Sequence, residues 1–264
     1  MPHYVAHRGG AARWAENSLT AFRGALAGGA TLLELDVHLT ADGEVAVIHD
    51  PTLERTSSGH GPLAACTAAD LRRARLRDAG GALTADCVPT LRDVLEVVAP
   101  SGAGLLVEIK TPGAAVVYAR RGERVEPVPG PRYAGLERKV LDMLAQAGCT
   151  GRAIVMAFNP AVVSEVRALA PEQPTALLVD DHHVQEAGVP PMMALAWARA
   201  AGVKYVGLHH SLCDAALVTA AHEAGILVGV FTVNDAETMR RLERAGVDLI
   251  ITDHPELIPA EGDR

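Results

Sequence analysis

Acidic side chains interrupt two apolar runs of this 264-residue sequence. Glu34 and Asp36 are two positions apart in one run, and Glu108 precedes Lys110 by two positions in another. Because alternate side chains of a strand share a face, each pair points the same way if these runs are strands. Buried carboxylates are costly unless cations neutralise them. Three oxygen donors from neighbouring strands suit Mg²⁺ or Ca²⁺, and buried ion pairs with Arg8 or Lys110 are the other interpretation.

Two histidines could transfer protons beside these carboxylates. His7 and Arg8 stand before two glycines at the end of the first apolar run, which combines a titratable imidazole, a permanent cation and a backbone open to a ligand. Arginine is suited to bidentate binding of phosphate oxygens. The sequence Asp-Gly at positions 42 and 43 predicts a hairpin turn, and a turn centred there places His49 opposite Asp36. A bulge would shift this register by one residue.

Asparagine occurs where predicted strands give way to predicted helices. Asn17, Asn159 and Asn234 all lie at such points, so helix capping is their ordinary role. Asn17 follows Glu16, and this pair could also line a site.

Several other polar residues receive simpler interpretations. His38 is in phase with Asp36 but begins the hairpin, so we expect it on a solvated face. Asp253 ends the last predicted strand and could be a helix cap or a site residue. Neighbouring residues in a strand point to opposite faces, so at most one of His209 and His210 can contact a substrate.

Strands and helices must position these side chains. Short β-branched runs alternate with Ala- and Leu-rich stretches, which is typical of parallel βα units. The predicted strands are Tyr4–His7, Leu32–Leu39, Gly104–Lys110, Ala153–Phe158, Thr175–Val179, Lys204–Leu208, Ile226–Val233 and Asp248–Thr252. The predicted helices are Ser18–Ala27, Leu91–Val98, Tyr133–Ala147, Ala161–Leu169, Pro191–Ala201, Asp214–Ala224 and Ala236–Ala245. About eight units favour a (β/α)8 TIM barrel forming a single domain over residues 1–264, with an open doubly wound sheet as the alternative.

Two segments break this alternation. Pro51–Val88 is rich in turn residues and contains a predicted helix around Leu71–Arg77, so it is interpreted as a small insertion (residues 51–88) after the second strand. Val116–Arg132 is predicted to form a hairpin that turns at Gly122. Both follow strands, which places them at the carboxyl end of the barrel as candidate walls over a substrate.

Composition excludes several classes of protein. With 32 acidic against 24 basic residues and a net charge of -8, the chain lacks the basic excess expected for binding nucleic acid or an anionic membrane. The 49% hydrophobic content is enough for a full core. Four scattered cysteines and no signal peptide or membrane span indicate a cytoplasmic protein with reduced thiols and no stable membrane association.

The polar residues also carry a family resemblance, spread in order over nearly the whole chain. The sequence resembles the glycerophosphodiester phosphodiesterase family in these motifs: H-R-G-G (7–10), E-N-S (16–18), E-L-D-V-H-L-T-A-D-G (34–43), H-D-P-T-L-E-R-T (49–56), V-E-I-K (107–110), F-N-P (158–160), F-T-V-N (231–234) and G-V-D-L-I-I-T-D-H-P (246–255). The resemblance implies a TIM barrel with a small insertion after the second strand. One departure is Phe231, where the family often has Trp.

The resemblance also implies roles for individual residues. Glu34, Asp36 and Glu108 would bind one divalent metal ion, Mg²⁺ or Ca²⁺, and His7 and His49 would be the catalytic acid–base pair. The residues expected to bind the substrate are Arg8, Lys110, Glu16, Asn17, Phe158 and Phe231.

The expected reaction is metal-dependent hydrolysis of a small-molecule glycerophosphodiester to glycerol 3-phosphate and an alcohol. The nucleophile would be metal-bound water or the neighbouring glycerol hydroxyl. Two alternatives remain open: a lysophospholipase D or sphingomyelinase D-like enzyme acting on acylated substrates, and a non-catalytic protein that binds glycerophosphodiesters.

Overall fold

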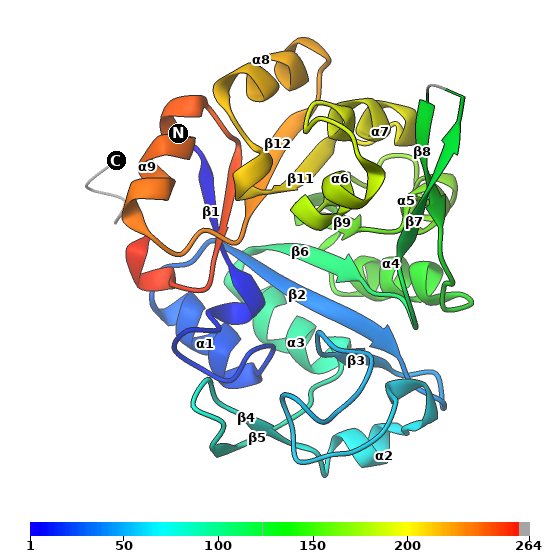
Figure 1. Ribbon diagram of the computed structural model, residues 1–264. Helices are drawn as coiled ribbons and strands as arrows, with labels where there is room; N and C mark the ends of the chain where they lie inside the picture. The colour runs from blue at the N-terminus through cyan, green and yellow to red at the C-terminus, as the bar shows by residue number, and fades with distance from the viewer. Residues whose placement is uncertain (123, 259–264) are drawn as a thin grey trace.

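Eight parallel strands form a closed barrel in the computed structural model, which describes residues 1–122 and 124–258 (Figure 1). Around the ring these strands are β1 (His3–Ala6), β2 (Leu32–Leu39), β6 (Gly104–Ile109), β9 (Ala153–Ala157), β10 (Thr175–Val179), β11 (Tyr205–His209), β12 (Leu227–Phe231) and β13 (Leu249–Thr252). Strand β1 pairs with both β13 and β2, and the second pairing closes the ring. The predicted (β/α)8 barrel is confirmed, and the open sheet is excluded.

Helices surround the barrel (Figure 1). They are α1 (Leu19–Ala27), α3 (Leu91–Val98), α4 (Leu136–Gln146), α5 (Pro160–Leu169), α6 (Asp181–Ala187), α7 (Met193–Ala201), α8 (Ala215–Glu223) and α9 (Ala236–Ala245). Helix α6 was not predicted, because its seven residues are too few to show a helical repeat; its ends are marked by Asp180 as N-cap and Gly188 in the left-handed conformation. Among the described residues, no helix is both long and apolar enough to cross a membrane.

Alternation along the strands separates two environments. In β6, Leu105 and Val107 join the cluster between barrel and helices, whereas Leu106 joins a smaller cluster inside the barrel. Glu108 is in phase with Leu106, and all six residues of β6 are buried. The same alternation in β2 turns Glu34 to the interior. The period of two thus explains why strands so apolar contain carboxylates.

The hairpin after β2 has a register one residue away from the predicted one. Strand β3 (Val45–Val47) runs antiparallel to β2 with Val37 opposite Val47, so Ile48 rather than His49 lies opposite Asp36. The reason is the loop length: Thr40 pairs with Glu44, which leaves three loop residues ending in a left-handed Gly43. Three-residue hairpin loops of this kind are common.

The segment between β3 and α3 builds its own apolar cluster. It contains α2 (Ala68–Leu71), β4 (Arg75–Arg77) and β5 (Leu83–Cys87), and Leu63, Leu71 and Leu76 pack within the cluster. The predicted helix around Leu71–Arg77 is wrong, since α2 ends at Leu71 and a strand follows. Buried Leu76 between two arginines is a period-two pattern.

The predicted hairpin at 116–132 is confirmed. Strands β7 (Val116–Arg121) and β8 (Arg124–Pro129) pair antiparallel around a turn that contains Gly122. The Trp197 indole of α7 donates a hydrogen bond of 3.0 Å to the Val125 carbonyl, and its ring lies 4.9 Å from that of Tyr118. These contacts fasten the hairpin to the helices outside the barrel.

Candidate active site

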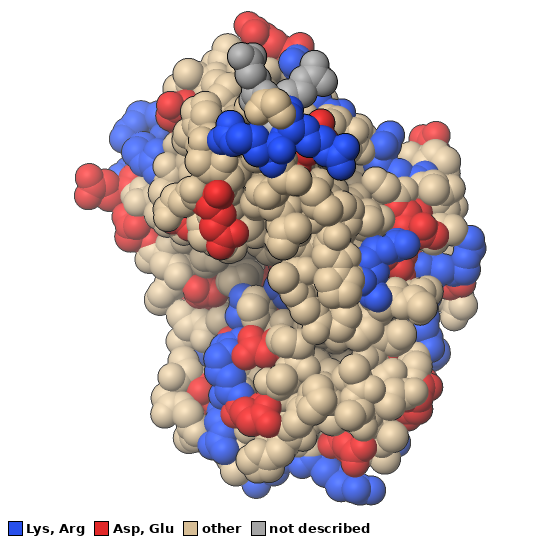
Figure 2. Space-filling model, turned by 45° about the vertical axis from the view of Figure 1, so that its right-hand side comes forward, with Lys and Arg blue, Asp and Glu red and all other residues tan. Residues whose placement is uncertain are grey.

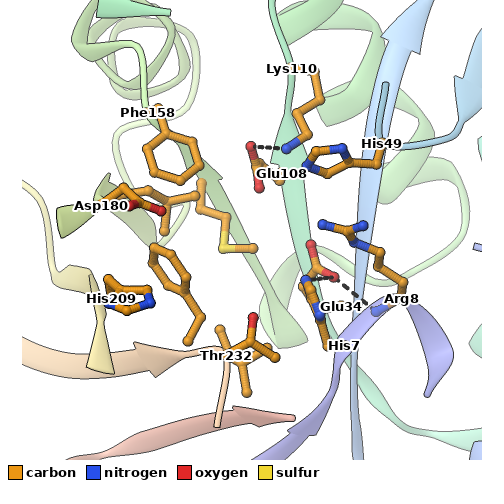
Figure 3. A pocket seen from close by; sticks show the side chains of 14 residues that line it. His7, Arg8, Glu34, His49, Glu108, Lys110, Phe158, Asp180, His209 and Thr232 are labelled. Atoms are coloured by element: carbon orange, nitrogen blue, oxygen red, sulfur yellow. Dashed lines mark hydrogen bonds and ion pairs between the residues drawn. The ribbon is translucent and has the colours of Figure 1, made fainter. Parts of the chain in front are cut away.

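A pocket of about 240 Å³ opens at the carboxyl ends of the barrel strands (Figure 3). The described residues that line it are His7, Arg8, Glu34, His49, Glu108, Lys110, Met156, Phe158, Leu178, Asp180, His209, Phe231, Thr232 and Ile251. One side of the pocket is charged and the other is largely apolar (Figure 3). The face shown in Figure 2 is hollowed, with acidic and basic side chains beside the hollow.

Three carboxylates converge at the pocket, and two of them, Glu34 and Glu108, belong to its lining. Glu34, Asp36 and Glu108 are buried, and each offers an oxygen within 4.8 Å of the others. Register places them there, since Asp36 lies opposite Glu108 in the β2–β6 pair. Oε1 of Glu34 is buried without a hydrogen-bond partner. A buried carboxylate oxygen without a donor is costly, and carboxylate oxygens are the ligands that Mg²⁺ and Ca²⁺ prefer. The residues therefore fit a divalent cation.

Two cationic side chains lie against this cluster, so ion pairs neutralise part of its negative charge. Lys110 Nζ lies 3.1 Å from Asp36 Oδ1 and 2.6 Å from Glu108 Oε1, and Arg8 Nε lies 3.3 Å from Asp36 Oδ2. Burial acts to raise the pKa of Asp36, but Lys110 and Arg8 outweigh it and hold that pKa well below its usual value.

Glu34 is compensated less, because Arg8 acts to lower its pKa but does not offset burial. Burial, followed by the nearby charge of Asp36, raises the pKa of Glu34 well above its usual value. Three carboxylates thus face two cations, and a further positive charge would complete the balance.

His7 lies in a short 3₁₀ turn directly after β1. Its Nδ1 is 2.6 Å from Asp253 Oδ1, and its Nε2 is 3.8 Å from Glu34 Oε2. A carboxylate only accepts hydrogen bonds, so Nδ1 carries a proton. Nε2 is then the nitrogen that can exchange a proton with a bound molecule.

His49 has the same arrangement from the other side of the site. Its Nδ1 lies 2.7 Å from Asp50 Oδ1, and Arg55 donates to both oxygens of Asp50, at 2.6 Å and 2.9 Å. Burial lowers the pKa of His49. The site therefore contains two histidine–aspartate pairs, each with Nε2 available for proton transfer.

The loop after β1 requires unusual backbone conformations. Arg8 has φ 51° and Asn17 has φ 58°, values that are uncommon outside glycine. A side chain at Gly9 would lie 2.8 Å from Ala21 Cβ of α1. The close approach positions Arg8, whose main-chain N–H donates to Glu34 at 3.0 Å. Such strain is typical of functional sites.

Glu16 and Asn17 lie behind the pocket. Glu16 accepts a hydrogen bond of 3.0 Å from Arg8, and Asn17 Nδ2 donates to Asp36 at 2.9 Å. Ser18 is the cap of α1, so the capping role expected for Asn17 is wrong. Neither residue is among the described ones that line the pocket, so their contacts act on Arg8 and Asp36.

The opposite wall is aromatic. The rings of Phe158 and Phe231 meet edge to face at 5.9 Å, and Asp180 and His209 stand beside them (Figure 3). Asp180 also caps α6. Burial acts to raise the pKa of Asp180, but hydrogen bonds from its neighbours lower it to about 2.

His38 was expected on a solvated face, and this is wrong. It is 1% exposed, because Tyr133 covers it: the hydroxyl of Tyr133 lies 3.0 Å from His38 Nδ1. Burial lowers the pKa of His38 to about 4. The sequence could not show this, since Tyr133 is 95 positions away.

Of the remaining predictions, which concern two asparagines and Asp253, one is confirmed and one is wrong. Asn159 caps α5 as expected, whereas Asn234 hydrogen-bonds Asp253 at 2.7 Å and Asp235 caps α9. Asp253, left open between two roles, belongs to the site through His7. The sequence contained a signal for this role, because Asp253 follows the last barrel strand and the carboxyl ends of barrel strands carry functional groups.

Neither the insertion nor the 116–129 hairpin contributes a described residue to the pocket lining, so the expected walls are wrong. The hairpin lies behind the residues that line the pocket. Tyr118 of the hairpin contacts His183, with ring centroids 5.8 Å apart, and His183 contacts Phe158 at 5.3 Å.

A TIM barrel whose carboxyl end gathers three carboxylates, two imidazoles and two cations defines an enzyme for an anionic substrate. Comparison with known proteins narrows this class. Residues 7–257 match the model of the glycerophosphoryl diester phosphodiesterase family, so the chain belongs to that family. It is thereby a hydrolase of phosphoric diesters, and the predicted membership is confirmed.

Individual relatives are similar to this chain over nearly their full length. A glycerophosphodiester phosphodiesterase of Caldanaerobacter subterraneus subsp. tengcongensis is 30% identical over 260 residues, covering 96% of this chain and 95% of the relative. One of Bacillus altitudinis is 31% identical, covering 97% and 96%. A phosphodiesterase of Oleispira antarctica, solved in complex with the product sn-glycerol-3-phosphate, superposes with a TM-score of 0.79 at 25% identity, covering 97% of this chain and 94% of that one.

Proposed function

We propose that the protein hydrolyses glycerophosphodiesters to glycerol 3-phosphate and an alcohol in this pocket. The observation that carries the proposal is the convergence of two histidine–aspartate pairs on one cluster of buried carboxylates. Family membership and the product complex of the Oleispira relative support the choice of substrate.

Glu34, Asp36 and Glu108 would hold one divalent cation, Mg²⁺ or Ca²⁺. When bound, the cation supplies positive charge that stabilises a phosphodiester as negative charge grows on its oxygens. Arg8 and Lys110 line the pocket beside these carboxylates, and they would bind the phosphate.

His7 and His49 would share the proton transfers. One Nε2 takes a proton from the attacking hydroxyl, and the other gives a proton to the departing alcohol. Each positioned transfer contributes on the order of 10²–10⁴ in rate. Asp253 and Asp50 fix the two rings in the required tautomer. The attacking hydroxyl is either that of water or the glycerol hydroxyl next to the phosphate. Attack by the glycerol hydroxyl is favoured by proximity, and it would expel the alcohol and form a cyclic phosphate that water then opens to glycerol 3-phosphate.

The test is release of glycerol 3-phosphate from a panel of glycerophosphodiesters with Mg²⁺, with Ca²⁺ and with EDTA. We expect metal-dependent release that falls at least about 100-fold in His49→Ala. A cyclic phosphate appearing before glycerol 3-phosphate would identify the intramolecular route.

The same panel separates the alternatives. Activity confined to acylated substrates would indicate a lysophospholipase D-like enzyme. Binding without turnover under every condition would indicate a non-catalytic protein. Full activity in His49→Ala would overturn the acid–base assignment.

A further inference from the structure

We propose that His38 and Tyr133 are positioning residues that hold His49 in place for proton transfer. The proposal rests on the function proposed for His49 and adds two residues that do not line the pocket.

The geometry fixes the protons of His38. Its Nε2 lies 3.0 Å from the main-chain carbonyl oxygen of His49, and its Nδ1 lies 3.0 Å from the Tyr133 hydroxyl. A carbonyl oxygen only accepts, so Nε2 carries the hydrogen and donates it. In the neutral ring Nδ1 is then the acceptor, and the Tyr133 hydroxyl donates to it. The His49 carbonyl thereby fixes the tautomer of His38, and Tyr133 supplies the donor that Nδ1 of this tautomer requires.

The main chain at His49 depends on this donor because the sheet has ended. Strand β3 stops at Val47, and the last main-chain bond to β2 runs from Ile48 N–H to the Asp36 carbonyl at 3.0 Å. His38 continues the attachment one residue further with its side chain. The imidazole of His49 then reaches the pocket and bonds Asp50. A shift of about 1 Å in a catalytic group can cost about 100-fold in rate.

Tyr133 brings this support from outside the β2–β3 hairpin. It lies between β8 and α4, and its ring meets that of His38 edge to face, with centroids 5.7 Å apart. His38 is therefore held in position by a segment that follows β8, while it holds the segment that follows β3. His38 of β2 thus connects the loop after β8 with the loop after β3.

A double-mutant cycle tests the proposal. His38→Leu removes the donor, His38→Gln offers an amide N–H to the same carbonyl, and Tyr133→Phe removes only the hydroxyl. We expect His38→Leu to lower kcat about 10- to 100-fold with KM little changed. We expect His38→Gln to recover most of the loss, and Tyr133→Phe to cost about two- to fivefold.

The decisive measurement repeats each substitution in the His49→Ala background, where the loss should vanish because the group being positioned is gone. His222→Leu is the matched control: His222 also hydrogen-bonds through Nε2, to Asp248 at 2.9 Å, and it does not line the pocket. Its kcat should equal that of the wild type.

An equal loss from His38→Leu in the presence and absence of the His49 imidazole would overturn the proposal, as would unchanged kcat in both His38→Leu and Tyr133→Phe. If His38→Leu does not fold, the Tyr133→Phe cycle decides on the same criterion. Full activity of His49→Ala alone would instead refute the proposed function of His49, which keeps the two failures distinct.

Discussion

Nδ1 of His7 lies 2.6 Å from Oδ1 of Asp253, so a hydrogen bond joins the end of the first barrel strand to the end of the last. Asn234, after β12, donates to the other oxygen of Asp253 at 2.7 Å. Three consecutive strands of the ring thus contribute to the orientation of one imidazole. An aspartate held in this way keeps the proton on Nδ1 and stabilises the ring when Nε2 also gains one.

Replacing Asp253 by Asn should therefore lower kcat at least about 10-fold while leaving KM nearly unchanged, because the amide lacks the charge that stabilises a protonated His7. Steady-state kinetics at saturating metal across a range of pH provides the measurement. Asp214→Asn, which alters the N-cap of α8 away from the pocket, is the control. Wild-type kcat in Asp253→Asn would show that His7 does not transfer a proton.

Chelation should lower the thermal stability of the protein as well as its activity. The three carboxylates face two cations, so a bound divalent ion relieves repulsion in the folded state only. A free metal concentration of 100 times Kd stabilises the folded state by about 2.7 kcal/mol. Thermal unfolding curves with EDTA, with Mg²⁺ and with Ca²⁺ measure the change. Glu108→Gln should lose the response, whereas Glu126→Gln on the exposed hairpin should keep it. An equal metal response in Glu108→Gln would remove Glu108 from the ligand set.

The pair formed by Asp50 and Arg55 should make stability depend on pH in the acid range. Hydrogen bonding from Arg55 lowers the pKa of Asp50 to about 2. A carboxyl whose pKa is lower folded than unfolded stabilises the fold above its unfolded pKa of about 4, and this stabilisation is lost as the pH falls toward 2.

Because Arg55 is 48% exposed, solvent reduces the contribution to about 1 kcal/mol. Asp50→Asn should lower the free energy of unfolding by that amount near neutral pH, by less as the pH falls through the folded pKa, and by nothing well below it. Urea denaturation at several pH values measures this. A difference that stays constant over the whole range would contradict the assignment.

Asp180 should favour substrates whose alcohol carries a positive charge. It is an ionised carboxylate on the aromatic side of the pocket, beside Phe158 and Phe231, and aromatic faces also attract cations. Asp180→Asn should lower kcat/KM for glycerophosphoethanolamine about fivefold relative to glycerophosphoglycerol, as expected for one partly exposed charge pair. Equal losses for both substrates would instead place Asp180 against their common glycerol.

Patterns within short stretches of the sequence predicted the features that depend only on neighbouring residues. The alternation of two in β2 and β6 indicated that Glu34, Asp36 and Glu108 face the interior, and the βα alternation indicated the barrel. The register of the β2–β3 hairpin was harder to predict. A two-residue and a three-residue loop at Asp42-Gly43 are both compatible with the sequence, and they place His49 opposite different residues. The burial of His38 and the partnership of His7 with Asp253 join residues 95 and 246 positions apart, and no local pattern reports such contacts.

The pairing of the first barrel strand with the last has a consequence for the newly made chain. His7 leaves the ribosome well before Asp253, which lies 246 positions later, yet the two must meet for the His7 imidazole to be oriented. Glu34, Asp36 and His49 are also synthesised before Asp253, so a nascent chain carries these groups before the site is complete. Turnover requires the closed ring, so the appearance of enzyme activity during refolding would report that the first and last barrel strands have paired.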